Sequence, residues 1–346
     1  MSSADKVLTV LGELVVDMLP VPEASAGPEG TAPQFVARPG GNALNVAVAA
    51  GRLGVPVRLM ARLGTGPLGA NLRRHAELSG VDPGGFVEAT EPVSLAVVGL
   101  APDGSADYGF HVVGAADWQW TDDELAGVLP EGTAILHVGS ISSWTAPGCE
   151  SIARLDERLA GEGGALISVD PNIRPMLADG PVGASRGNTA EIVRERLDRL
   201  IGHADVVKVS AEDLAWLEPT AGDTTLDATA LDATARAWAE RGPALVLVTD
   251  GSSPLRIARP GHAVLHWRTP KVTVVDTVGA GDSLAAALLA GLLDSGVTDR
   301  AALVALPDED LLRLVDDAAL VAALNCTRVG ADPPTRAEFA AARAER

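Results

Sequence analysis

The sequence predicts an α/β protein built on a doubly wound, mostly parallel sheet flanked by helices. Three observations support this fold class. Short segments rich in Val, Ile and Leu recur along the 346 residues, segments of helix length separate them, and turn-forming or acidic residues follow several of them. Strands that alternate with helices form parallel sheets, because each helix carries the chain back to the start of the next strand. No internal repeat is evident, so we expect a single domain over residues 1–346.

Several apolar segments are expected to form the strands of this sheet. The first, Val7 to Val16, is apolar at most positions, which is typical of a strand buried on both faces, and Asp17 follows its end. Ligands bind at the carboxyl ends of such strands, so Asp17 is a candidate site residue. Further strands are expected at Val57 to Ala61, Ala134 to Val138, Ala165 to Val169, Asp205 to Val209 and Ala244 to Thr249.

A small β lid is expected outside the main sheet. Several prolines and glycines in Met18 to Pro39 indicate loops and short edge strands. Ser94 to Leu100 and Asp107 to Val113 flank a turn-rich segment, which predicts a hairpin. We expect the lid to be built from about residues 18–34 and 94–113.

Helices are expected to begin at polar capping residues. Asn42 can cap a helix that ends near Gly54, and Thr121 and Glu124 have the spacing of a capping box. Alanine and leucine supply helix propensity in later segments. Further helices are expected at Leu226 to Glu240 and Ser283 to Leu293.

Composition narrows the classes of partner. The formal net charge of -19 repels phosphate backbones and anionic lipid, so we expect neither nucleic acid nor a membrane as a partner. The apolar run from Val7 lacks the basic cluster of a signal peptide, and no uninterrupted apolar stretch reaches about 18 residues. The two cysteines, Cys149 and Cys326, are far apart and suggest no disulfide framework. We therefore expect a cytoplasmic protein.

The segment Asp276-Thr277-Val278-Gly279-Ala280-Gly281-Asp282 carries the strongest chemical signal. It follows the strand-forming residues of Lys271 to Val275 and opens the helix expected at Ser283. Small residues allow a ligand to approach the backbone, and the helix N-terminus offers unpaired N–H groups to an anion. A carboxylate there can accept the proton of an attacking hydroxyl. The plain alternative is a glycine-rich turn with an acidic helix start.

This segment resembles the second signature of the ribokinase-like (PfkB-type) carbohydrate kinases. Pro39 to Ala47, with Gly40-Gly41-Asn42 at its centre, resembles the first signature of the same family, and the resemblance spans nearly the whole chain. It implies an ATP-dependent sugar kinase that uses Mg²⁺ and possesses a catalytic base at Asp282. The anion hole is then formed by Gly279, Ala280 and Gly281.

Two further segments of the sequence lead us to expect fructose as the preferred acceptor. Asp170 to Pro175 and Gly139 to Ser142 resemble strings of fructokinase-like members. A kinase for ribose, a 2-keto-3-deoxy sugar acid or a nucleoside is the alternative within the family. A catalytically silent sugar sensor on the same scaffold is the alternative of another class, and the resemblance also implies a homodimer.

The resemblance assigns sugar-binding roles to residues near the first signature and after one later strand. Asn42 and Asn45 offer donors and acceptors suited to hydroxyls, and Arg174 can clamp an oxygen. The alternatives are that Asn42 only caps its helix and that Arg174 forms a salt bridge with Asp170. The expected substrate-binding residues are Asp17, Gly41, Asn42, Asn45 and Arg174.

The nucleotide and ion sites follow from the same resemblance. Asp213 is expected to reach Mg²⁺ through water, although it is shorter than the family's acid, and Pro254 replaces a glycine of the nucleotide loop. Ser210 has the alternative role of a helix cap. Asp276, Val278 and Gly330 are expected to hold a monovalent cation such as K⁺. The expected nucleotide-binding residues are Ser210, Thr249, Gly251, Thr277, Gly281 and Asn325.

Overall fold

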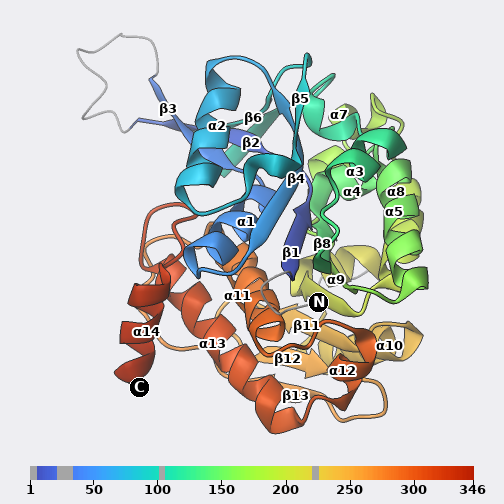
Figure 1. The fold of residues 1–346 in the computed structure, drawn as a ribbon, viewed down its shortest axis with the longest axis vertical. Coiled ribbons are helices and arrows are strands. Elements are labelled where there is room, and N and C mark those ends of the chain that lie inside the picture. The colour runs from blue at the N-terminus through green and yellow to red at the C-terminus, as the bar shows by residue number, and fades with distance from the viewer. Residues whose placement is uncertain (1–5, 22–33, 101–105, 220–225) are drawn as a thin grey trace.

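The computed structural model describes residues 6–21, 34–100, 106–219 and 226–346, and in them it shows a large sheet and a small one (Figure 1). The large sheet has the strand order β13-β12-β11-β10-β9-β8-β1-β4-β5. In this sheet β11, β10, β9, β8, β1, β4 and β5 pair in parallel with one another, whereas β12 pairs antiparallel with β11 and β13 pairs antiparallel with β12. Its strands are β1 (Val7–Leu11), β4 (Val57–Gly64), β5 (Phe86–Ala89), β8 (Thr133–Gly139), β9 (Leu166–Asp170), β10 (Val206–Ser210), β11 (Leu245–Thr249), β12 (Leu255–Ala258) and β13 (Leu265–Trp267).

Helices cover both faces of the large sheet, which confirms the predicted fold class. Strand residues alternate between two hydrophobic cores, as Leu247 and Val248 of β11 do, so the parallel strands are apolar at nearly every position. Helices α1, α2, α11 and α13 pack in one core, and α5, α8 and α10 pack in the other. The longer helices are α1 (Asn42–Arg52), α2 (Pro67–Leu78), α3 (Asp122–Val128), α5 (Cys149–Glu162), α8 (Ala190–His203), α9 (Ala211–Leu217), α10 (Ala228–Arg241), α11 (Ala280–Asp294), α13 (Asp308–Cys326) and α14 (Arg336–Ala344).

Short helices and turns complete the layers. The predicted capping box at Thr121 and Glu124 is present at the start of α3. The predicted helices near 42–50, 226–240 and 283–293 are confirmed as α1, α10 and α11. The short helical segments are η3 (Pro83–Gly85), η4 (Ala116–Trp118), α4 (Ser140–Trp144), α6 (Pro175–Ala178), α7 (Pro181–Ala184) and α12 (Arg300–Ala305).

The small sheet has the order β3-β2-β6-β7 and lies beside α1 and α2 at the top of the view in Figure 1. It contains the predicted hairpin, because β6 pairs antiparallel with β7. Most of the expected 18–34 segment, residues 22–33, falls outside the described residues, but β2 and β3 pair on either side of it. The strands are β2 (Val15–Pro20), β3 (Phe35–Gly40), β6 (Ser94–Leu100) and β7 (Ala106–His111).

The single strand expected over Val7 to Val16 is wrong. The chain leaves the large sheet after Leu11 and enters the small sheet at Val15, so Asp17 lies within β2, opposite Arg38. A carboxylate from η4 explains the break, because Asp117 accepts a hydrogen bond from Leu14 N at 2.8 Å. The backbone N–H of Leu14 therefore bonds to a side chain 103 residues away in the sequence instead of to a neighbouring strand.

The same short segment, η4, also forms hydrogen bonds at two further points where the chain passes between the two sheets. The second carboxylate oxygen of Asp117 accepts a hydrogen bond from Ser94 Oγ at 2.5 Å, where β6 begins. Trp118 Nε1 donates to Val112 O at 2.8 Å, just beyond β7. Gly41 adjoins the first connection, because a Cβ there would lie 2.7 Å from Glu13 O. Three chain crossings are thus bonded to one buried turn, and the fourth, at Gly41, adjoins the first of them.

The structure also shows the state of the segment Lys271 to Val275 and of the two cysteines. Lys271 to Val275 forms no strand; instead Val275 N donates to Cys326 O at 2.8 Å, so the segment is attached to the end of α13. Cys149 is buried and Cys326 is partly exposed, and both are free thiols. Of the helices in the described ranges, none combines the length and apolar character needed to span a bilayer.

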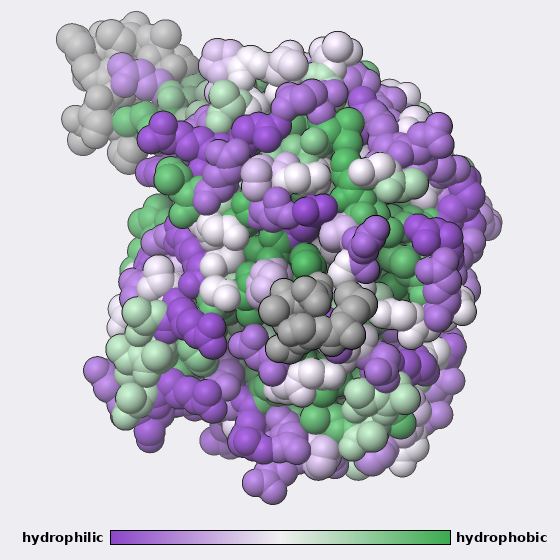
Figure 2. Space-filling model, viewed as in Figure 1, coloured by the Kyte–Doolittle hydropathy of each residue, from purple (hydrophilic) through white to green (hydrophobic). Residues whose placement is uncertain are grey.

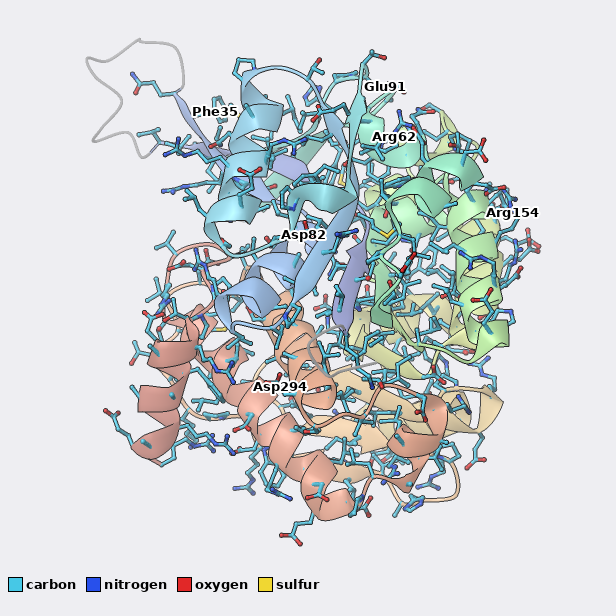
Figure 3. The ribbon with its side chains drawn as sticks, in the orientation of Figure 1. Phe35, Arg62, Asp82, Glu91, Arg154 and Asp294 are labelled. Carbon is cyan, nitrogen blue, oxygen red and sulfur yellow. The ribbon has the colours of Figure 1, made fainter. Side chains whose placement is uncertain are left out.

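Surface charge is organised in ion pairs around the large sheet. Hydrophilic residues surround much of the face in Figure 2, with apolar groups between them. Arg62 of β4, labelled in Figure 3, forms ion pairs with Glu91 at 3.0 Å and with Glu124 at 2.7 Å. It therefore links the loop that follows β5 to helix α3. This arginine is largely buried and satisfies backbone carbonyls as well.

Candidate active site

The predicted base lies where the first turns of α1 and α11 meet. Asp282, in the first turn of α11, accepts hydrogen bonds from Asn42 Nδ2 at 2.7 Å and from Asn45 Nδ2 at 2.8 Å. Residues three apart on a helix share a face, so both amides of α1 reach the same carboxylate. Asp282 is densely surrounded by protein but keeps part of its surface open to solvent.

The cap expected at Asn42 is wrong. The N-cap of α1 is Gly41, whose φ of 103° lies in the region that favours glycine, and Asn42 is the first helical residue. Asn42 is buried, and its Nδ2 group also donates to Asp170 Oδ2 at 3.3 Å. Its side chain therefore joins two carboxylates instead of capping the helix.

A buried ion pair lies beside the base at the ends of β9 and β10. Lys208 Nζ is 3.0 Å from Asp170 Oδ2, and both side chains are almost fully enclosed. Asp170 Oδ1 and Asn42 Oδ1 have no hydrogen-bond partner among the described residues. Lys208 was not among the predicted site residues, although a lysine in an otherwise apolar strand was the signal that could have found it.

Arg174 does not form the alternative salt bridge with Asp170, because Asp170 pairs with Lys208. Arg174 Nη1 donates instead to Asn172 Oδ1 at 2.7 Å, and Asn172 has a φ of 40°. Burial raises the pKa of Asp17 to about 6, and the charge of Arg174 partly offsets that rise. The two predicted substrate-binding groups therefore interact across the space between the small sheet and the large one.

The glycines before Asp282 form a tight backbone turn. Gly279 has a φ of 75° and is the N-cap of α11, and Ala280 N donates to Thr277 O at 3.2 Å. A helix N-terminus leaves its first N–H groups without helical partners and carries the positive end of the helix dipole. Gly279, Ala280 and Gly281 thus present a surface suited to an anion beside the carboxylate.

Replacing Gly279 by Ala is expected to weaken both folding and catalysis. The new Cβ would lie 2.6 Å from Ala331 Cβ, and a side chain at positive φ costs about 1–2 kcal/mol. We expect the free energy of unfolding to fall by at least about 1 kcal/mol and kcat to fall with it, measured by urea denaturation and steady-state kinetics. Gly202→Ala in α8 is the matched control, since its Cβ meets nothing within 4 Å. Equal behaviour of the two variants would refute the prediction.

The three residues predicted to hold a monovalent cation lie close together. The carboxylate of Asp276 accepts hydrogen bonds from Val278 N at 3.1 Å and from Gly330 N at 2.8 Å. Asn325, also expected near the nucleotide, donates to Val278 O at 2.8 Å, and its buried Oδ1 atom has no partner in the described part of the chain. The loops before α11 and after α13 are thereby held together around Thr277.

The remaining predicted nucleotide-binding residues lie at the ends of β10 and β11. Ser210 does cap α9, because its Oγ accepts from Asp213 N at 3.0 Å. Asp213 Oδ1 in turn accepts from Ile173 N at 3.0 Å, which connects α9 to the loop after β9. Thr249 ends β11, Gly251 has a φ of 52°, and Pro254 directly precedes β12.

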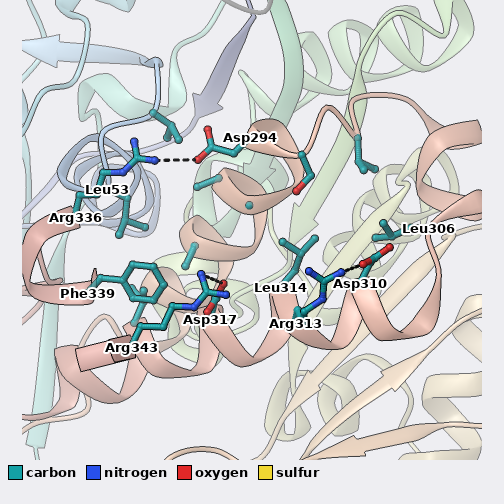
Figure 4. A pocket seen from close by; sticks show the side chains of 17 residues that line it. Leu53, Asp294, Leu306, Asp310, Arg313, Leu314, Asp317, Arg336, Phe339 and Arg343 are labelled. Carbon is teal, nitrogen blue, oxygen red and sulfur yellow. Dashed lines mark ion pairs between the residues drawn. The ribbon is translucent and has the colours of Figure 1, made fainter. Parts of the chain in front are cut away.

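A large groove of about 530 Å³ lies elsewhere, between α11, α13 and α14 (Figure 4). Leu53 and Phe339 line it, and it contains none of the predicted site residues. Ion pairs such as Arg343–Asp317 at 3.1 Å cross its wall and join α14 to α13. We therefore attribute the groove to the packing of α14 on the fold.

Comparison with known proteins identifies the family of this chain. Residues 5–338 match the family described as pfkB family carbohydrate kinase. The chain belongs to this carbohydrate kinase family. A fructokinase of Zea mays is 32% identical over 342 residues, which cover 98% of each chain. A fructokinase of Rhizobium leguminosarum bv. trifolii is 34% identical over 87% of this chain and 84% of its own.

Solved structures of the family have the same architecture. The crystal structure of a Xylella fastidiosa fructokinase with bound ATP superposes with a TM-score of 0.82 at 29% identity, covering 99% of both chains. A fructokinase variant of Vibrio cholerae, in a form with bound fructose, ADP and potassium ion, gives a TM-score of 0.78 at 26% identity, again over 99% of both chains. The chain is therefore a carbohydrate kinase of ribokinase-like fold.

Proposed function

We propose that this carbohydrate kinase transfers the γ-phosphoryl group of ATP to a primary hydroxyl of fructose. The contact of Asp282 with Asn42 and Asn45 beside the N-terminus of α11 carries the proposal. It combines a carboxylate that can accept a proton with N–H groups that can stabilise a negatively charged phosphoryl group. The named fructokinases among the relatives and structural neighbours support fructose as the acceptor.

In the proposed mechanism, the small sheet acts as the lid and the sugar lies between it and the large sheet. Asp17, Gly41, Asn42, Asn45 and Arg174 orient the sugar. Asp282 takes the proton of the hydroxyl as its oxygen attacks the γ-phosphorus in line. A new O–P bond forms, the bond to the β-phosphate oxygen breaks, and ADP leaves. Backbone N–H groups of Gly279, Ala280 and Gly281 stabilise the charge in the transition state.

The nucleotide is proposed to bind along the loops after β10 and β11 and before α11. Ser210, Thr249, Gly251, Thr277 and Asn325 lie there. Thr249 Oγ1 and the backbone at Gly251 are then available to the nucleotide, whereas the Ser210 hydroxyl is already bonded to the backbone of α9. A structural neighbour with bound ATP supports ATP as the nucleotide.

We propose that Mg²⁺ and K⁺ assist this reaction. Asp213 lies at the start of α9, where its carboxylate accepts a bond from Ile173 N, and a contact with the metal through water suits an ion that keeps much of its hydration shell. Mg²⁺ would neutralise phosphate charge when bound. The unpartnered oxygen of Asn325 and the backbone oxygens near Asp276, Val278 and Gly330 suit K⁺.

The experiment that tests the function is a coupled ADP-release assay over fructose, ribose, 2-keto-3-deoxygluconate, tagatose and adenosine. It is run with Mg²⁺, with and without K⁺. Rapid turnover of fructose alone supports the proposal, and preference for another acceptor overturns the choice of fructose. Sugar binding without any turnover would favour the alternative of a catalytically silent sensor.

We further propose a cytoplasmic homodimer that pairs through the small sheet. Phe35 and Val36 of the edge strand β3 expose 38% and 43% of their surface, which is unusual for an unpaired edge. Phe35 is labelled at the periphery of Figure 3. A monomeric mass in light scattering would contradict the dimer.

A further inference from the structure

The charge of Lys208 acts on the proposed base, and the position of this lysine in the fold is unusual. It lies on β10 between Val207 and Val209, which are buried in the second core, and points to the opposite face of the sheet. That face is covered by α1 and α11. The ammonium group is therefore enclosed beneath the two helix N-termini that form the site.

Gly281 shows how close the ammonium comes to α11. A Cβ at Gly281 would lie 2.7 Å from Lys208 Nζ and 3.4 Å from its Cε. The lysine thus contacts the backbone of the residue directly before Asp282. A cation beside a helix N-terminus is disfavoured by the helix dipole, so packing of α11 does not account for it.

Carboxylates from three elements face Lys208. Asp170 of β9 is in contact at 3.0 Å, and Asp282 of α11 and Asp213 of α9 act on it at longer range. Burial lowers the pKa of Lys208, but these carboxylates outweigh burial and raise it, so the amine stays protonated. His137 of β8 also faces the group, and burial lowers its pKa to about 4, so it is neutral at pH 7.

Stability alone is a poor explanation of this ion pair. A buried pair contributes little compared with apolar side chains of similar volume, because both charges lose hydration. Burial raises the pKa of Asp282 above its ordinary value. The charge of Lys208 opposes that rise, whereas the negative charge of Asp170 adds to it. The two members of the pair therefore have opposite effects on the same carboxyl group.

We propose that Lys208 is a positioning residue of the phosphoryl-transfer site whose ammonium, anchored on Asp170, keeps Asp282 ionised at neutral pH. The inference rests on the proposed role of Asp282 as the base. Lys208 acts through Asp282 and is not itself assigned a contact with substrate. Asp170 holds the Lys208 ammonium near the Gly281 backbone, and its negative charge limits the effect of Lys208 on Asp282.

The test is the acidic limb of the pH profile of kcat/KM in two single variants. Lys208→Met leaves Asp282 facing Asp170 without a cation, so the limb moves to higher pH. Asp170→Asn removes the opposing charge, so the limb moves to lower pH. A unit charge a few ångströms away shifts a carboxyl pKa by about one unit or more, which sets the expected size of each shift.

A charge-balanced variant keeps the test independent of folding. Lys208→Met with Asp170→Asn removes both charges, so it avoids an unpaired buried ion, and its limb is expected between those of the two single variants. Arg256→Met and Asp232→Asn form the control, because Arg256 is also buried, Asp232 is partly buried, and the pair bonds at 2.8 Å on β12 and α10. Its limb stays at the wild-type position.

A readout without turnover separates this inference from the proposed function. The pH dependence of the free energy of unfolding is compared for each variant with and without Asp282→Asn, and the difference reports the titration of Asp282. Shifts of opposite sign for Lys208→Met and Asp170→Asn support the inference even if no sugar is phosphorylated. An unchanged limb for Lys208→Met, or shifts of the same sign, would overturn it. Failure of wild-type turnover over all sugars refutes only the proposed function.

Discussion

Asp282→Asn is expected to lower kcat by about 100- to 10,000-fold, which is the usual contribution of a general base. An amide has the size of the carboxylate but cannot accept the hydroxyl proton. Asn45 donates no other side-chain hydrogen bond among the described residues, so its amide can turn to face the new NH₂ group. The sugar-binding groups therefore stay in place, and sugar affinity is expected to change little.

The measurement is kcat and KM by ADP release, together with the sugar dissociation constant by calorimetry. Asp294→Asn is the matched control, because Asp294 lies at the other end of α11 and is exposed (Figure 3). It is expected to retain wild-type kcat. A kcat for Asp282→Asn within about threefold of wild type would remove Asp282 from the mechanism.

The second large effect is expected in stability, at Asp156. This residue of α5 is fully buried, and neither carboxylate oxygen has a hydrogen-bond partner among the described residues. Burial, together with the charges of Glu157 and Asp205, raises its pKa to about 8, and the charge of Arg199 partly opposes this rise. The folded protein thus holds a neutral carboxyl group at pH 7.

The sign of the pH dependence follows from linkage. The folded pKa lies above the ordinary value of 3.8, so the folded state binds more protons between these values, and stability falls as pH rises. The slope from this one group is about 1.4 kcal/mol per pH unit between about pH 5 and 7. Asp156→Asn removes that slope, so the variant gains stability relative to wild type as pH rises.

Urea denaturation at pH 5, 6, 7 and 8 measures this difference. All other titrating groups are shared by the two proteins and cancel in the comparison. Asp122→Asn serves as the control, because Asp122 is exposed and its hydrogen bonds with Arg154 lower its pKa. Its titration lies below this pH range, so its difference from wild type is constant. Parallel curves for Asp156→Asn and wild type would contradict the prediction.

Most of the parallel sheet could be predicted because its central strands are local apolar runs, whereas the short edge strand β5 was not among the predicted strands. Strands near Ala134, Ala165 and Ala244 lie where their composition places them. The run beginning at Val7 could not be divided from the sequence, because the break depends on Asp117, which is distant along the chain. Tertiary hydrogen bonding overrides local propensity at this point.

The residues of the candidate site could be predicted where they belong to a sequence motif. They could not be predicted where two side chains distant in the sequence pair with each other. Asp282, Asn42 and Asn45 were each predicted, and the structure brings their side chains into contact. Their roles remain predictions. The local pair Asp170–Arg174 was wrong because the neighbouring strand supplies Lys208, a partner that spacing along the chain cannot indicate.

The convergence of three chain crossings on η4 makes the small sheet an exchangeable module. Asp117 fixes the crossings at Leu14 and Ser94, and Trp118 fixes the one at Val112. The base, its amide partners and the anion-binding turn all lie outside those crossings. The small sheet of a relative can therefore be grafted at the crossings bonded to η4. Acceptor preference can then be engineered separately from phosphoryl transfer.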